Sequence, residues 1–325
     1  MQQMHLYHTI RKPDRLPALF RQGKRGTLSY LTENGRRKMT GRTDIPGVLY
    51  LQEPTGNPAP VVFDSPHSGE VLPPEFEYVA SLHALRTGVD MFVDELFSAG
   101  PAEGAALLAA HFPRMFIDAN RSEDDIDPAM IDGNWTRGLN PTDKSAKGFG
   151  LIRTLALPDQ PVHGRPLTVA EIEYRIDRYF TPYHTALKQL IDQTRDRFGG
   201  VWHVDCHSMK SMGNKMNDDA GKPRPDFVIS DRDGTTSDPA FTAFVAGQLQ
   251  AAGYDASINW PYKGAALIQK YSDPATNRHS IQIEINRRLY MDEENYLKSS
   301  GFDQLKADLD KLVRDVVAYA RDQLR

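Results

Sequence analysis

VWHVDCHSM, residues 201–209, is the stretch from which the fold and the site can be inferred. Its first four residues have the apolar character of a buried β-strand, and the apolar pattern stops at Asp205. A strand that ends in Asp-x-His-Ser is typical of an open α/β sheet that carries a metal-binding or catalytic histidine at its carboxyl edge. A second stretch of this kind, VVFDSPHSG at 61–69, contains His67 in the corresponding place. We therefore expect the rest of the chain to bring His67 and His207 together.

Short apolar segments alternate with amphipathic ones along most of the chain. Strands are predicted at 48–52, 61–65, 114–117, 227–230, 257–260 and 280–285, besides the strand that begins at 201. Helices are predicted from Asp90 onward, from the capping-box pattern Thr168–Glu171 to about 198, at 239–252 and at 302–324. This order predicts an α/β fold with a mixed, mostly parallel sheet and helices on both faces. No linker divides it, so we expect one catalytic domain at 47–325.

Residues 1–46 differ in composition from the rest of the chain. They are rich in arginine and lysine, poor in acidic residues, and show no sustained apolar periodicity. A basic arm or a targeting peptide is one interpretation, and a poorly ordered extension is the other. Charge-rich segments without apolar spacing rarely pack against a core, so the pattern favours the extension.

The overall composition excludes several classes of protein. The chain has 325 residues, 40% hydrophobic and 25% charged, with a formal net charge of −4, which argues against a nucleic-acid-binding surface. No apolar run approaches the roughly 18–20 residues that a membrane span needs. Cys206 is the single cysteine, so no intrachain disulfide can form and a reducing, cytoplasmic setting is expected. We expect an enzyme that acts on a small molecule, without nucleic-acid or membrane partners.

The two histidines need a third protein ligand to form an open zinc site in which water fills the fourth place. Glu70 completes a His-x-x-Glu spacing with His67, whereas Asp90 stands further along, at the start of the next predicted helix. Both acids are candidates. A hydrogen-bonded core residue is the alternative for a lone histidine, but the repeated context of His67 and His207 favours a metal site.

Two further carboxylates lie in strands beside this candidate site. Asp205 points to the same side of its strand as His207 and is expected to orient that ligand by a hydrogen bond. Glu284 lies within IQIEI, residues 281–285, where a carboxylate costs free energy unless it is exposed or used. Next to a metal-bound water it would act as general base and then as proton donor, and a solvent-facing position on an edge strand is the alternative.

Cationic residues follow several of the predicted strands. Asn120 and Arg121 close the segment that begins at 114, and a guanidinium group is suited to binding a substrate carboxylate. A structural ion pair with a neighbouring aspartate is the competing interpretation for Arg121. Arg153 and Lys263 are further candidates for binding the substrate.

Six motifs, in this order, resemble those of the N-formylglutamate amidohydrolase family. They are SPHSG (65–69), VDMFVDELF (89–97), DANR (118–121), DCHS (205–208), RPDFVISDRDGTT (224–236) and IQIEINRRLYMDE (281–293). The resemblance covers about residue 47 to the end. It implies a zinc-dependent hydrolase with a core like that of the zinc carboxypeptidases. The namesake reaction of the family converts N-formyl-L-glutamate to formate and L-glutamate in histidine catabolism.

The resemblance also implies roles for particular residues. His67 and His207 match the metal histidines of the family, Arg121 matches its substrate-side arginine and Glu284 its strand carboxylate. The family pattern keeps an aspartate at position 90, which favours Asp90 over Glu70 as the third ligand of zinc or of another divalent ion. A carboxypeptidase-like peptidase, a deacylase for another N-acyl amino acid, and an inactive ligand-binding protein of the same fold are the alternative functions.

Overall fold

The computed structural model describes residues 21–22, 28–29 and 41–325 of the chain. The chain divides into two compact units, Met1–Thr40 and Gly41–Arg325. In the first unit, the strands β1 (Arg21–Gln22) and β2 (Leu28–Ser29) pair antiparallel. Most of what was predicted for 1–46 falls outside the described residues. The second unit begins with a strand at Arg42–Ile45, ahead of the expected domain start at 47.

The second unit is built on an eight-stranded mixed sheet, in the order β13-β12-β14-β11-β5-β6-β4-β3. The four strands β14, β11, β5 and β6 pair in parallel with one another, and the antiparallel pairs lie outside them. This confirms the predicted α/β class. The strands are β3 (Arg42–Ile45), β4 (Leu49–Gln52), β5 (Val61–Ser65), β6 (Ala106–Ala110), β11 (Val201–Met209), β12 (Phe227–Ser230), β13 (Ala256–Ile258) and β14 (Arg278–Asn286).

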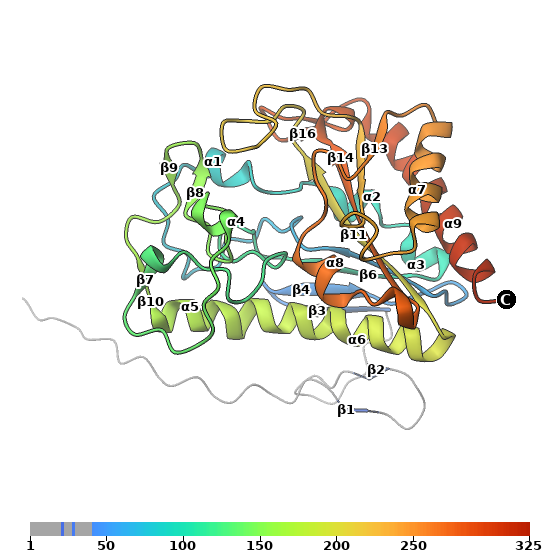
Figure 1. Ribbon diagram of the computed structural model, residues 1–325, viewed down its shortest axis with the longest axis horizontal. Helices are drawn as coiled ribbons and strands as arrows, with labels where there is room; N and C mark the ends of the chain where they lie inside the picture. Colours follow the sequence, from blue (N-terminus) through green and yellow to red (C-terminus); the bar gives the residue numbers. More distant parts are fainter. Residues whose placement is uncertain (1–20, 23–27, 30–40) are drawn as a thin grey trace, which may run out of the picture. The chain divides into compact units, whose positions relative to one another are not determined.

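Helices cover both faces of this sheet. One face packs under α7 and α9, which stand together at the right of Figure 1, and the long helix α6 runs along the other face. The helices are α1 (Leu82–Arg86), α2 (Val93–Leu96), α3 (Gly100–Glu103), α4 (Asp143–Ala146), α5 (Val169–Arg175), α6 (Thr181–Phe198), α7 (Pro239–Ala251), α8 (Ala266–Tyr271) and α9 (Phe302–Asp322). A π-helical turn, Ile176–Phe180, joins α5 to α6. Among the described residues, no helix has the length and apolarity that a membrane span requires.

Short two-stranded ribbons complete the unit. The strand β7 (Ile131–Asp132) pairs in parallel with β10 (Leu167–Thr168). The other two ribbons are antiparallel and join β8 (Leu155–Leu157) to β9 (Gln160–Pro161), and β15 (Met291–Asp292) to β16 (Leu297–Lys298).

The alternation of side chains sorts β11 and β14 into an apolar face and a polar face. Val204 and Cys206 of β11 lie in the core with α7 and α9, so Cys206 is a buried core residue as its position in the strand indicated. Asp205, His207 and Glu284 lie on the opposite side. The residues that can perform chemistry are therefore gathered on the face against which α6 packs.

Two predicted elements differ from the structure, and one strand was not predicted. The segment 114–117 is a buried turn instead of a strand. The helix expected from Asp90 is reduced to the short α2, because Phe92 adopts a left-handed φ of 64° immediately before it. The residues from 106 to 110 form the strand β6, because Gly104 ends α3 with φ of 99°, a conformation that suits glycine.

We predict that Thr168→Ala lowers the free energy of unfolding by about 1 kcal/mol, measured by urea denaturation, because it removes the N-cap of α5. The Thr168 hydroxyl accepts a hydrogen bond from the backbone N–H of Glu171, and the Glu171 carboxylate accepts one from the N–H of Thr168 at 2.7 Å. Thr194→Ala, within α6, is the matched control and should leave the stability unchanged or slightly raised. Equal losses in both variants would contradict the role of the cap.

Candidate metal centre and active site

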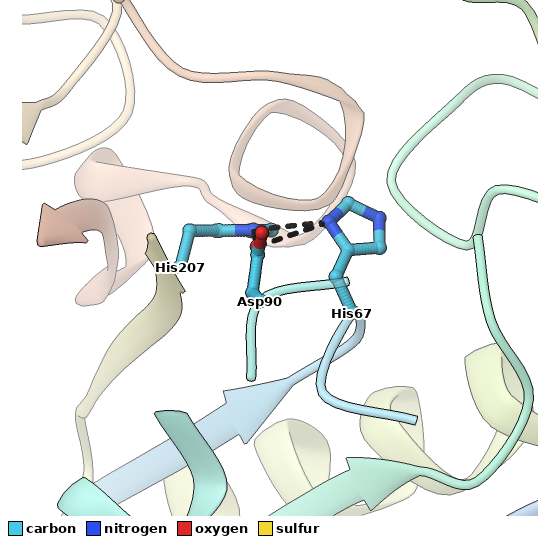
Figure 2. A group of neighbouring side chains, drawn as sticks. All are labelled: His67, Asp90 and His207. Atoms are coloured by element: carbon cyan, nitrogen blue, oxygen red, sulfur yellow. Dashed lines mark hydrogen bonds and ion pairs between the residues drawn. The ribbon is translucent and has the colours of Figure 1, made fainter. Parts of the chain in front are cut away.

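Three buried side chains from distant parts of the chain converge at the carboxyl edge of the sheet (Figure 2). His67 follows β5, His207 lies near the end of β11, and Asp90 lies between α1 and α2. The Nδ1 atoms of the two histidines are 3.1 Å apart. Asp90 Oδ2 lies 3.0 Å from Nδ1 of His207 and 3.6 Å from Nδ1 of His67. One ligand atom from each residue thus lies within 4.8 Å of the others, as a bound metal ion requires.

Backbone contacts fix the two loops that carry His67 and Asp90. The backbone N–H of Asp90 donates to the carbonyl of His67 at 2.9 Å, so the two ligand loops are joined directly. A Cβ on Gly69 would lie 2.3 Å from the carbonyl carbon of His111, so only glycine allows the His67 loop to approach the neighbouring backbone this closely. Arg287 holds the other loop, donating to Asp90 Oδ1 at 2.9 Å and to the carbonyl of Val89 at 2.8 Å.

Each histidine is oriented from behind by a carboxylate. Nε2 of His67 is 2.7 Å from Asp118 Oδ1, and Nε2 of His207 is 2.6 Å from Asp205 Oδ1. When Nε2–H donates to a carboxylate, a neutral imidazole presents the lone pair of Nδ1 to the other side. Two lone pairs and the Asp90 carboxylate then face one another at close range. With both rings neutral such an arrangement is repulsive, and either a proton on His207 or a divalent cation between the three groups relieves the repulsion.

The electrostatics of the cluster also favour a positive charge. Burial by itself would lower the pKa of His207, but the charge of Asp205 and the hydrogen bonds to Asp205 and Asp90 outweigh it, so the pKa is raised well above its ordinary value. Burial would raise the pKa of Asp90, yet both histidines and the guanidinium of Arg287 hold it well below its usual range. The position between these groups is thus suited to a proton on His207 or to a metal ion in its place.

Glu284 stands beside the cluster on the neighbouring strand. It is the register partner of His207 in the parallel pair of β11 with β14, and its Oε1 accepts a hydrogen bond from Gln282 Nε2 at 2.9 Å. Burial raises its pKa to about 7, and only 9% of the residue surface is exposed. A carboxyl group with such a pKa can accept and release a proton near neutral pH. β14 lies inside the sheet, so Glu284 is not a solvent-facing residue of an edge strand.

A cavity of about 610 Å³ opens beside Glu284 and the three candidate metal ligands, His67, Asp90 and His207. The four residues that the sequence suggested for substrate binding all line it: Asn120, Arg121, Arg153 and Lys263. The guanidinium of Arg121 donates to the carbonyls of Phe149 and Asn120, at 2.5 and 2.7 Å. Arg153 is buried and pairs with Asp118, whereas the exposed Lys263 pairs with Asp233 at 2.8 Å.

Asn120 lines the same cavity with its amide already engaged, whereas Glu70 lies away from the metal ligands. The Asn120 amide donates to Asp205 Oδ2 at 3.0 Å and accepts from the backbone N–H of Leu267 at 2.9 Å. Its side chain is thus engaged with the carboxylate that orients His207. Glu70, the alternative metal ligand, forms an exposed ion pair with Arg86 at 3.0 Å and is outside the group of converging ligand atoms.

Comparison with known proteins shows the family of the chain. The family model of N-formylglutamate amidohydrolase matches residues 59–291. The chain belongs to the N-formylglutamate amidohydrolase family. It is 29% identical, over 269 residues, to an N-formylglutamate deformylase of Pseudomonas aeruginosa, covering 81% of this chain and 95% of the relative.

Solved structures give the same result for the fold. The crystal structure of the N-formylglutamate amidohydrolase from Ralstonia eutropha JMP134 is 42% identical and has a TM-score of 0.82, over 85% of this chain and 99% of the other. The gene product Atu2144 from Agrobacterium tumefaciens is 14% identical with a TM-score of 0.62, over 85% and 95% of the two chains, which indicates a shared fold.

Three residues that support the site in this family member were missed in the sequence. Asp118 accepts from His67, and Arg114 donates to Asp118 at 2.8 Å, four residues apart. Burial would raise the pKa of Asp118, but the charge of Arg114 outweighs it and holds the pKa well below its usual range. Arg287 is the third. Asp118 and Arg287 each lie within a motif that had been recognised, DANR (118–121) and IQIEINRRLYMDE (281–293), but neither motif shows which partner the side chain contacts.

We predict that Asp90→Asn lowers zinc affinity by more than about 100-fold, because a neutral amide replaces the carboxylate ligand. Bound metal after equilibrium dialysis is the measurement. Glu70→Gln, the matched control at the alternative ligand, should keep wild-type metal content. Loss of metal in Glu70→Gln with retention in Asp90→Asn would reverse the ligand assignment.

We also predict that Asp118→Asn weakens metal binding by about 10- to 100-fold, because His67 loses the carboxylate that fixes its tautomer and raises its basicity. The same dialysis experiment measures it, with circular dichroism to confirm that the fold is retained. Asp132→Asn, at an exposed aspartate, is the control. Unchanged affinity in Asp118→Asn would show that His67 is oriented by other contacts.

Proposed function

We propose that the protein is a zinc-dependent deformylase that hydrolyses the amide bond of N-formyl-L-glutamate to give formate and L-glutamate. The observation that carries this proposal is the convergence of His67, Asp90 and His207 next to the carboxyl group of Glu284, whose pKa is raised to about 7 by burial. Its relatives in Pseudomonas aeruginosa and Pseudomonas putida, both N-formylglutamate deformylases, support it.

The donor set supports zinc as the metal. Two imidazole nitrogens and one carboxylate oxygen match the three protein ligands of hydrolytic zinc sites, which leave a place open for water or substrate. When bound, the ion acts as a Lewis acid toward the formyl oxygen and makes a nearby water more acidic. The protein contributes the orientation of the ligands, through Asp118 and Asp205, and the shelter of a buried site.

Glu284 is the residue that moves the proton. In the proposed step it accepts a proton from the attacking water, whose oxygen forms a bond to the formyl carbon. The bond between that carbon and the nitrogen then breaks, and the nitrogen receives the proton that Glu284 held. A raised pKa suits this double role, because the group must take up the proton and release it in one turnover.

The cations around the cavity suit an anionic substrate. Arg121 is held by two backbone carbonyls through Nε and Nη1, which orients its planar guanidinium. The remaining donors of that group can bind a carboxylate. Arg153, paired with Asp118, adds positive charge on the same side of the cavity.

We predict that Glu284→Gln lowers kcat for N-formyl-L-glutamate by about 100- to 10,000-fold, because an amide cannot take up the proton of the attacking water. Formate release by the zinc-loaded protein is the measurement, with metal content determined in parallel and expected to be unchanged. Glu294→Gln, at an exposed glutamate, is the matched control.

Two results of the same assay would contradict the proposal. Wild-type turnover in Glu284→Gln would remove Glu284 from the mechanism. A zinc-loaded wild-type protein that releases no formate from N-formyl-L-glutamate, or that is equally active after chelation of the metal, would contradict the zinc-dependent deformylase activity itself.

A further inference from the structure

The cavity beside the candidate metal ligands is lined by more cationic side chains than metal-dependent hydrolysis requires. Six of its arginines and lysines are buried or half-buried: Arg114, Arg121, Arg153, Lys210, Arg224 and Arg287. Four of the six pair with carboxylates of the protein. Arg114 and Arg153 pair with Asp118, Arg224 with Asp219 and Arg287 with Asp90. The charges of these four are thus compensated within the protein.

The other two cations, Arg121 and Lys210, form no ion pair with a carboxylate of the described residues. Arg121 is held by backbone carbonyls alone. The Lys210 ammonium has neither a hydrogen bond nor an ion pair with the part of the chain that the structure describes. A half-buried ammonium without a partner is destabilising, because burial removes some of its hydrogen bonds to water and no protein group replaces them. Both groups therefore favour an anion in the cavity.

Lys210 is placed by the same strand that carries a metal ligand. It follows β11 directly, three residues after His207, and its carbonyl accepts a hydrogen bond from Arg224 Nη1 at 3.2 Å. The charge of Glu293 by itself would raise the pKa of Lys210, but its carboxylate accepts hydrogen bonds from the backbone N–H of Ser211, at 3.1 and 3.2 Å, and forms no ion pair with Lys210.

The neighbours of Lys210 are otherwise positive. Burial, and then the charges of Arg287, Arg224 and Arg153, lower the pKa of Lys210 to about 8. The group is still protonated at neutral pH, and no carboxylate within the described part of the chain forms an ion pair with it.

We propose that Lys210 is a specificity-determining residue that binds the side-chain carboxylate of a dicarboxylate substrate, while Arg121 faces the α-carboxylate. This inference rests on the proposed function, since N-formyl-L-glutamate carries two carboxylates and the cavity offers two half-buried cations that no carboxylate of the described residues neutralises. A charge-assisted hydrogen bond in a partly desolvated cavity distinguishes a carboxylate from the isosteric, neutral amide of glutamine.

We predict that Lys210→Met lowers kcat/KM for N-formyl-L-glutamate by about 10- to 100-fold, as expected for the loss of one charge-assisted hydrogen bond. The kcat/KM for N-formyl-L-glutamine should change by less than about threefold, because that substrate has no side-chain charge to lose. Lys210→Arg should retain the preference for glutamate. Lys215→Met, at an exposed lysine in the loop that follows β11, is the matched control.

The result that would overturn the inference is an equal loss on both substrates, or no loss on either. If the wild-type protein hydrolyses neither substrate, the proposed function fails, and calorimetric binding of L-glutamate and L-glutamine then tests Lys210 by itself. Tighter binding of glutamate by the wild type, abolished in Lys210→Met, supports the inference. Equal affinity of the wild type for the two amino acids overturns it.

Discussion

The site depends on the parallel pairing of β11 with β5 on one side and with β14 on the other. Asp205 is the register partner of Asp64 in β5 and of Gln282 in β14, and His207 is the partner of Glu284. Because side chains alternate along a strand, a shift of β11 by one residue would turn His207 into the apolar layer and Cys206 toward the cavity. The apolar layer under α7 and α9 resists such a shift, so the core of the protein also fixes the geometry of the metal ligands.

The polar face that this register creates would be unstable without internal partners. Asp64 and His203 are fully buried beneath the site. Burial and the charge of Asp205 raise the pKa of Asp64, which accepts hydrogen bonds from His203 Nε2 and from the Tyr183 hydroxyl, both at 2.7 Å. His203 in turn has the Ser280 hydroxyl at 3.1 Å from Nδ1. These contacts offset the cost of burying polar groups, and Tyr183 links α6 to the strand that precedes His67.

Much of the fold and part of the site could be predicted from local sequence. The strands β5 and β12 and the helix α9 were predicted because buried strands and amphipathic helices leave patterns within a few residues. His67, His207 and Glu284 could be singled out because each stands at or near the end of such a strand. The run ALLAA, residues 106–110, gave no such signal, since an apolar run this short fits a helix as well as a strand.

What the sequence could not indicate are contacts between distant residues in irregular segments. Asp90 was expected to open a regular helix, but its position is set by Arg287, 197 residues further along the chain. Asp118 contacts His67 because the fold brings the buried turn at 114–117 next to the end of β5, and the two residues are 51 positions apart in the sequence. Lys210 could not be singled out from the sequence. Whether it has a carboxylate partner depends on which carboxylates pair with the arginines around it, and those ion pairs join distant residues.

The distribution of charge connects the metal position with the substrate cavity. Asp90 and Asp118 are each neutralised in part by arginines that also line the cavity, namely Arg287, Arg114 and Arg153. A divalent cation between the ligands would add two positive charges to a buried region that already holds Arg121 and Lys210 without carboxylate partners among the described residues. A dicarboxylate substrate would add two negative charges beside them. Since an uncompensated buried charge is destabilising, the cation would then favour binding of the substrate, and thermodynamic reciprocity requires that the substrate favour binding of the cation to the same extent.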